Sequence, residues 1–113
     1  MTSIEIILPI RTISESNIRE CWQAKHRRAK SQRAAAFLML KRYRRSMNGK
    51  SLVVTLTRIG ARKLDSDNLA RSMKAVRDGI ADALGIDDGS DRIEWKYAQE
   101  KGKYAVKVTI ELG

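Results

Sequence analysis

The sequence is poor in the residues on which several classes of small protein depend. Its one cysteine, Cys21, excludes an internal disulfide, and with one histidine, His26, it also excludes a zinc finger. No apolar run approaches the roughly 20 residues that cross a bilayer. Residues 1–5 lack the features of a secretory signal peptide. We therefore expect a soluble, cytoplasmic protein without a membrane partner.

Acidic residues are missing from a long part of the chain. Between Cys21 and Lys63 there is no aspartate or glutamate, whereas from Asp65 to Gly113 acidic residues outnumber basic ones. The net charge of +10 is therefore concentrated in the first part. A cationic segment without acidic neighbours favours binding to a polyanion, with nucleic acid as the expected partner. The alternative is that the charged run is only a solvated helix face.

The apolar pattern predicts one α+β domain over residues 1–113, since 42% hydrophobic residues supply one modest core. Alternating apolar residues predict strands at Ile4–Leu8 and Leu52–Leu56. Alternation over Ile93–Tyr97 and Val106–Leu112 predicts a C-terminal hairpin.

Two helices are expected between these strands. A long helix is predicted over roughly Glu15–Tyr43, which is rich in strong helix formers and contains neither glycine nor proline. A second begins near Asp65 and ends at Gly85, with a regular apolar stripe from Leu69 to Leu84. The predicted order is β-α-β-α-β-β, with two helices packed on a mixed sheet.

The second predicted helix carries charged residues on the side opposite its apolar stripe. At about 100° per residue, Asp67, Lys74 and Asp78 fall along one line. Asp65 lies at the strand-to-helix junction and can point into the same space as Asp67. The Asp87-Asp88-Gly89 turn lies roughly 25 Å away along a straight helix, so a shared site requires the chain to fold back or a dimer to form.

These carboxylates suggest a site for Mg²⁺, or for Mn²⁺ in its place, because both ions prefer oxygen ligands. Two simpler explanations stay open. Asp67 is a good N-cap at a helix start, where a carboxylate also complements the helix dipole. The Asp87-Asp88-Gly89 turn is ordinary turn chemistry.

Cationic side chains on the long helix and near the acids are candidates for phosphate contacts. The expected DNA-binding residues are Arg27, Arg28, Lys30, Arg33, Arg62, Lys63 and Arg71. His26 is expected on the surface rather than in catalysis. We expect Trp22, Trp95 and Tyr97 in the core or a subunit contact rather than in a base-stacking platform.

Three segments together resemble the RusA-type Holliday junction resolvases, small endodeoxyribonucleases common in bacterial prophages. The segments are Asp65-Ser66-Asp67-Asn68-Leu69, Lys74–Ile80 and Ala83–Asp88, within a match over residues 62–100. The resemblance implies a homodimer that binds four-way DNA junctions and nicks two symmetrically related strands by Mg²⁺-dependent hydrolysis, without a small-molecule cofactor. It also implies a bacterial cell and a gene carried by a phage or prophage.

The resemblance assigns roles by position. Lys74 would be the essential lysine because Lys-Ala-Val-Arg-Asp continues the family pattern, with Arg71 as the alternative cation. Asp87 would be a further candidate ligand. The metal ligands, which also belong to the catalytic set, would be Asp65, Asp67 and Asp88.

Two other functions stay open. One alternative to the resolvase is a nucleic-acid-binding module without catalysis. The other is a Mg²⁺-dependent nuclease that acts on single strands or RNA. Each of these functions would use the cationic segment to bind nucleic acid, as a resolvase would. They differ from a resolvase in whether they cut and in which substrate they act on.

Overall fold

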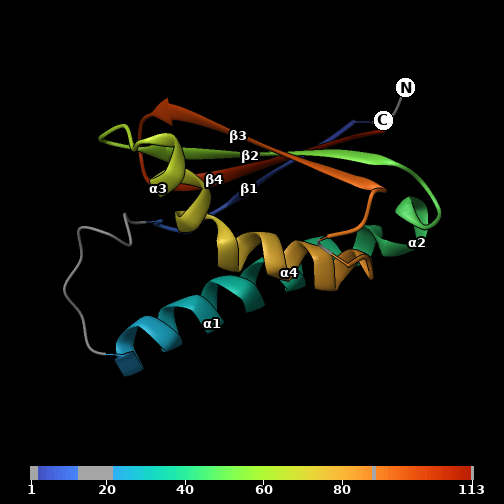
Figure 1. Ribbon diagram of the computed structural model, residues 1–113, viewed down its shortest axis with the longest axis horizontal. Helices are drawn as coiled ribbons and strands as arrows, with labels where there is room; N and C mark the ends of the chain where they lie inside the picture. The colour runs from blue at the N-terminus through green and yellow to red at the C-terminus, as the bar shows by residue number, and fades with distance from the viewer. Residues whose placement is uncertain (1–2, 13–21, 88, 113) are drawn as a thin grey trace.

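The chain forms a four-stranded sheet with helices α1 and α4 side by side against one of its faces (Figure 1). The computed structural model describes residues 3–12, 22–87 and 89–112. The elements are β1 (Ser3–Leu8), α1 (Trp22–Leu40), the 3₁₀ turn η1 (Lys41–Tyr43), α2 (Arg44–Met47), β2 (Leu52–Gly60), α3 (Ser66–Ser72), α4 (Lys74–Leu84), β3 (Ile93–Lys101) and β4 (Ala105–Leu112). The predicted α+β class and the β-α-β-α-β-β order are confirmed.

Strand alternation separates a buried face of the sheet from an outer face. Val54 lies opposite Ile110 and Leu56 opposite Val108 in the β2–β4 ladder, and all four side chains are fully buried. Directly paired residues share one face, so these rows form the core beneath the helices. We call the other side the outer face; its charged residues are Glu5, Glu94, Lys96, Glu100, Lys107 and Glu111.

The strand order is β1-β4-β2-β3, and it changes the predicted pairing of the last two strands. Both C-terminal strands form, but each pairs with β2, β3 in parallel and β4 in antiparallel orientation, so they are not a hydrogen-bonded hairpin. The connection between them passes the end of β2, where the Gly102 N–H donates to the Gly60 carbonyl oxygen over 3.1 Å. Alternation predicts the two faces of a strand but not its partner.

The second predicted helix is divided into α3 and α4 at Met73, whose φ of −98° and ψ of −1° depart from helical values. The Ser72 hydroxyl donates to the Leu69 carbonyl oxygen over 2.7 Å, a local bond of the kind that bends helices. The line through Asp67, Lys74 and Asp78, derived for a straight helix, is therefore wrong. The apolar stripe is confirmed, since its members Leu69, Met73, Val76, Ile80, Ala83 and Leu84 are all buried.

Helix α1 packs along α4 with few buried residues of its own, namely Gln32, Ala36 and Leu40. The approach is close because Gly79 of α4 has no side chain: a Cβ there would lie 2.3 Å from the carbonyl oxygen of Arg33. The predicted first part of this helix, from Glu15, lies outside the described residues. Most of the α1 surface is thus left to solvent, and this surface carries the cationic residues.

Candidate metal centre and nucleic-acid interface

Asp65 and Asp67 lie at the start of α3 with exposed side chains. Asp65 is the N-cap residue, with an extended backbone (φ −61°, ψ 155°), yet its side chain makes no capping hydrogen bond. The prediction that Asp67 is the N-cap is therefore wrong; Asp67 lies in the first turn, where the helix dipole favours a carboxylate. Within the described part of the chain, neither carboxylate has a hydrogen-bond or ion-pair partner.

The segment before Asp65 is held by side chains from the sheet. The Gln99 side chain of β3 accepts a hydrogen bond from the Leu64 N–H (2.8 Å) and donates one to the Leu64 carbonyl oxygen (2.7 Å). The buried Arg58 guanidinium of β2 donates to the carbonyl oxygen of Arg62 over 2.6 Å. These contacts satisfy the backbone hydrogen-bonding groups of Arg62 and Leu64. They thereby fix the position of the α3 start, which carries the two carboxylates.

The two aspartates of the turn after α4 cannot be treated alike. The Asp87 carboxylate accepts a hydrogen bond from the Gly89 N–H over 3.0 Å, so this side chain serves the turn, as the simpler explanation predicts. Asp88 lies outside the described residues. Over residues 3–12, 22–87 and 89–112, no group of three or more His, Cys, Asp or Glu side chains is arranged to hold a metal ion. Two of the three expected ligands are thus described, and their exposed carboxylate oxygens are the donor type that Mg²⁺ prefers.

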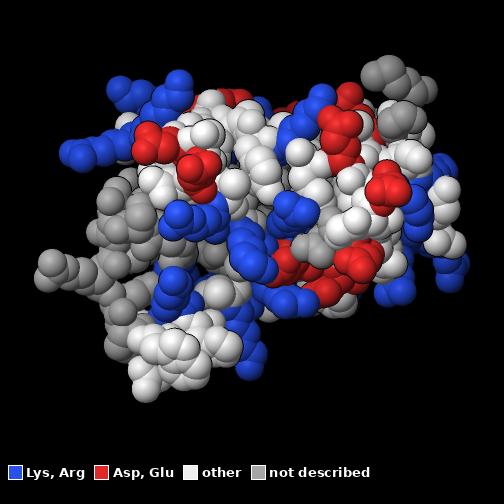
Figure 2. All heavy atoms as spheres, viewed as in Figure 1, with Lys and Arg blue, Asp and Glu red and all other residues white. Residues whose placement is uncertain are grey.

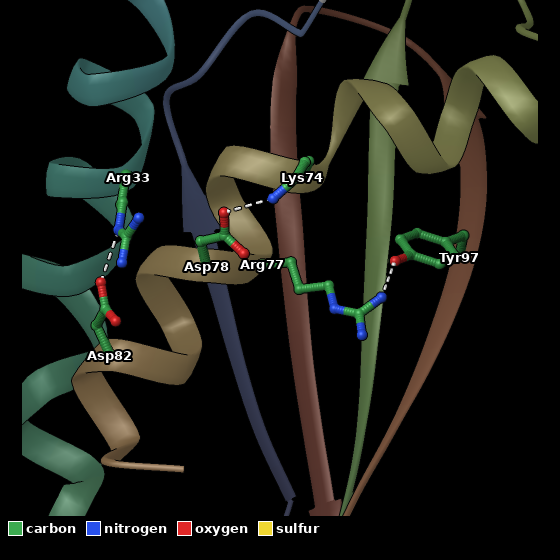
Figure 3. A network of polar contacts seen from close by, with 6 residues as sticks. All are labelled: Arg33, Lys74, Arg77, Asp78, Asp82 and Tyr97. Carbon is green, nitrogen blue, oxygen red and sulfur yellow. Dashed lines mark hydrogen bonds and ion pairs between the residues drawn. The ribbon is translucent and has the colours of Figure 1, made fainter. Parts of the chain in front are cut away.

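Lys74 forms an ion pair with Asp78 one turn further along α4, with 3.0 Å between Nζ and Oδ2 (Figure 3). The Lys74 side chain is nevertheless 75% exposed, so this surface pair contributes under about 1 kcal/mol to stability. Arg71, the alternative cation, lies exposed in the last turn of α3 and makes no ion pair with Asp67 in the structure. Both cations therefore lie near the α3–α4 junction.

A groove of about 520 Å³ separates α1 from the α3–α4 junction, and we call it the α1–α4 groove. Its charged and polar lining residues are Lys25, His26, Arg28, Lys30, Gln32, Arg33, Arg71, Ser72, Lys74 and Asp78. The lining thus contains six cations and one carboxylate. Figure 2 shows basic side chains gathered around the hollow between these helices. The sequence did not indicate that the cations of α1 face Arg71 and Lys74 across a groove.

The expected phosphate-binding residues divide into those that line this groove and those that do not. Arg27 is exposed on α1 but does not line it, and Arg62 and Lys63 line a separate hollow beside Glu100 and Lys101. The groove contains four of the seven expected residues, namely Arg28, Lys30, Arg33 and Arg71.

Two further sets of contacts hold α4 to its neighbours, one to α1 and one to β3 (Figure 3). Arg33 of α1 pairs with Asp82 of α4, with 2.7 Å between Nε and Oδ2, and this bond joins the two helices. Arg77 of α4 donates to the Tyr97 hydroxyl over 3.1 Å, and its guanidinium lies 4.8 Å from the ring centre of Trp95. Trp95 and Tyr97 are partly buried against the core, as expected.

The expectation that Trp22 lies in the core is wrong, because the residue is 73% exposed; a subunit contact for it stays a prediction. Its ring stacks on that of His26, with 5.4 Å between centroids and 11° between planes. His26 is exposed, as predicted. The i, i+4 spacing of the two rings on one helix was the signal in the sequence that would have indicated this pair.

Comparisons with known proteins add no assignment. No protein-family model matches the chain, and no curated protein matches it. None of the helices in the described segments has the length and apolar character needed to cross a membrane. The function is therefore inferred from the residues of the chain itself.

Proposed function

We propose that this protein is a metal-dependent endodeoxyribonuclease that binds branched DNA and nicks it. The observation that carries the proposal is the position of Asp65 and Asp67: these two exposed carboxylates, without partners in the described chain, lie at the start of α3, and the last turn of the same helix carries Arg71, which lines the cationic groove. A metal ion held by carboxylate oxygens can act on a phosphodiester, and cations on the same helix can bind its phosphates. The resemblance to RusA-type resolvases supports the same chemistry.

Asp65 and Asp67, with Asp88, would hold Mg²⁺ or Mn²⁺. When bound, the metal would activate a water molecule near neutral pH and polarise the phosphodiester. The ammonium of Lys74 neutralises the charge that develops on the phosphate, which first requires it to leave Asp78. Arg71 holds a neighbouring phosphate from the same wall of the groove.

The proposed assembly is a homodimer, since paired nicks in two symmetrically related strands need two sites related by a two-fold axis. The proposed setting is the cytoplasm of a bacterial cell, with the gene carried by a phage or prophage. Light scattering with and without junction DNA tests the assembly: a monomer that nicks one strand only contradicts paired resolution.

Cleavage assays on labelled four-way junctions, linear duplex and single strands, in Mg²⁺ or EDTA, test the activity. We expect Mg²⁺-dependent nicking of the junction, and Asp67→Asn should abolish nicking while retaining binding and thermal stability. Glu94→Gln, which changes an exposed carboxylate on the outer face, is the matched control and should cut normally. If Asp67→Asn cuts at the normal rate, the metal assignment is wrong; if the parent binds all substrates and cuts none, the chain is a binding module.

A further inference from the structure

The α1–α4 groove has an exposed aromatic pair next to its cations. His26 lines the groove and also stacks on Trp22, one turn earlier on α1. Trp22 keeps 73% of its surface exposed despite this stack, so most of the indole stays open to a ligand. An exposed tryptophan contributes little to folding, whereas a flat apolar ring beside bound phosphates is suited to a nucleobase.

Cations stand on both walls of the groove. Lys30 comes from α1 and Arg71 from α3, and neither makes an ion pair within the described residues. Only one carboxylate, Asp78, lines the groove, and Lys74 already pairs with it. A sugar-phosphate backbone lying between the walls would therefore meet positive charge on two sides.

We propose that the α1–α4 groove binds an unpaired segment of nucleic acid, with its phosphates between the two cationic walls and one base stacked on Trp22. This proposal rests on the proposed function, from which it takes nucleic acid as the polyanion. It adds that the bound strand is unpaired. Bases within a duplex are stacked on their neighbours and offer no free face, whereas an unpaired base offers one to an aromatic side chain. A strand leaving a helix at a branch point has this form.

Fluorescence anisotropy in EDTA measures this binding without any cleavage. The probes are labelled oligo-dT, oligo-rU and the matched dA·dT duplex, at several salt concentrations. We expect both single strands to bind more tightly than the duplex, and their relative affinity identifies whether DNA or RNA is preferred. Trp22→Ala should weaken single-strand binding about tenfold or more, and Trp22→Phe should retain much of the affinity because an aromatic face remains.

A matched control tests whether removing any exposed apolar side chain from α1 weakens binding. Leu38 is 60% exposed on the same helix but does not line the groove, so Leu38→Ala should bind like the parent. Because Trp22 and Leu38 are both outside the core, circular dichroism should show folded proteins with similar melting temperatures.

The cationic walls are tested through the salt dependence. Each lost phosphate contact lowers the slope of log affinity against log salt by about 0.7 for a single strand. Lys30→Ala and Arg71→Ala should each show this change, whereas Lys96→Ala, on the outer face and paired with Glu94, should not.

Equal affinity for duplex and single strand, or unchanged single-strand binding by Trp22→Ala, overturns the proposal. These outcomes are distinct from failure of the proposed function. A protein that binds single strands through Trp22 but cuts nothing retains this inference and loses the nuclease. A protein that nicks junctions normally with Trp22→Ala, and binds single strands no better than duplex, retains the nuclease and loses this inference.

Discussion

The α1–α4 groove and the outer face of the sheet both carry lysine, but they arrange their charges differently. On the outer face each lysine meets glutamate: Lys107 lies 2.8 Å from Glu100 and 3.9 Å from Glu5, and Lys96 lies 3.7 Å from Glu94. In the groove six cations share a lining with the single carboxylate of Asp78. A total charge of +10 does not say where a polyanion would bind, whereas the distribution of acids favours the groove.

The core beneath α4 and the outer face of the sheet also differ in how much they contribute to stability, and the same substitution in each measures this difference. Ile80 of α4 is fully buried, so Ile80→Ala should lower the free energy of unfolding by about 2–5 kcal/mol. Ile7 on the outer face is 52% exposed, and Ile7→Ala should change it by about 0.5 kcal/mol or less. Urea denaturation monitored by circular dichroism gives both values. Equal losses would mean that the outer face is covered in solution.

The close approach of α1 to α4 gives the next largest effect. Gly79→Ala places a Cβ against the Arg33 carbonyl oxygen and 2.9 Å from the Ala36 Cβ, so α1 must move outward. We expect a loss of about 1–3 kcal/mol in unfolding free energy, together with weaker anion binding because the groove walls separate. Thermal melts and anisotropy on the same variant test both parts. A destabilised variant with unchanged binding would show that the groove does not depend on this contact.

Removing one acid from each region sharpens the comparison of charge. Asp78→Asn releases Lys74 and leaves the groove lining without a carboxylate, so single-strand affinity should rise and the salt slope should steepen by about 0.7. Glu100→Gln on the outer face removes the same charge, and it should leave the slope unchanged. Parallel salt titrations compare the two. If both variants gain affinity equally, binding depends on net charge alone.

The smallest effect concerns the outer face alone. The hydrogen bond from the Lys107 ammonium to Glu100 raises the pKa of Lys107 above its ordinary value; the charges of Glu100 and Glu5 add to this, and partial burial opposes it. A raised pKa in the folded state means that the stabilisation is fully present below the ordinary lysine pKa and is lost as the pH rises through the higher folded value. Glu100→Gln should therefore lower the Lys107 pKa in an NMR titration and remove part of the stability loss at strongly alkaline pH. An unmoved pKa would place Glu100 away from Lys107.

The parts of the fold that the sequence predicts are those with a strong period. The Leu69–Leu84 stripe predicts a buried helical face, and Gly85, with a φ of 68°, ends α4 where expected. The break at Met73 was not predicted because the apolar period continues through it. The sequence also does not predict that β3 and β4 pair with β2, since this pairing depends on contacts between distant segments.

For the candidate site, local spacing predicts the acids at the α3 start but not their surroundings. Asp65 and Asp67 lie at a strand-to-helix junction, as expected. The clamp of Gln99 on Leu64 joins residues 35 apart in sequence, and nothing in either segment indicates the other. The exposure of Trp22 likewise depends on which side of α1 faces α4, and the loose apolar pattern of α1 does not define that side.

The position of β4 has a consequence for how the molecule is made. β4 is the last described strand, yet it lies between β1 and β2 and hydrogen-bonds to both. During synthesis, therefore, β1 stays unpaired until β4 has been made. Before that point, β2 and β3 can already pair with each other. The four-stranded sheet can close only after β4 has left the ribosome, so we expect folding to be slow and any truncation before Ala105 to prevent this closure.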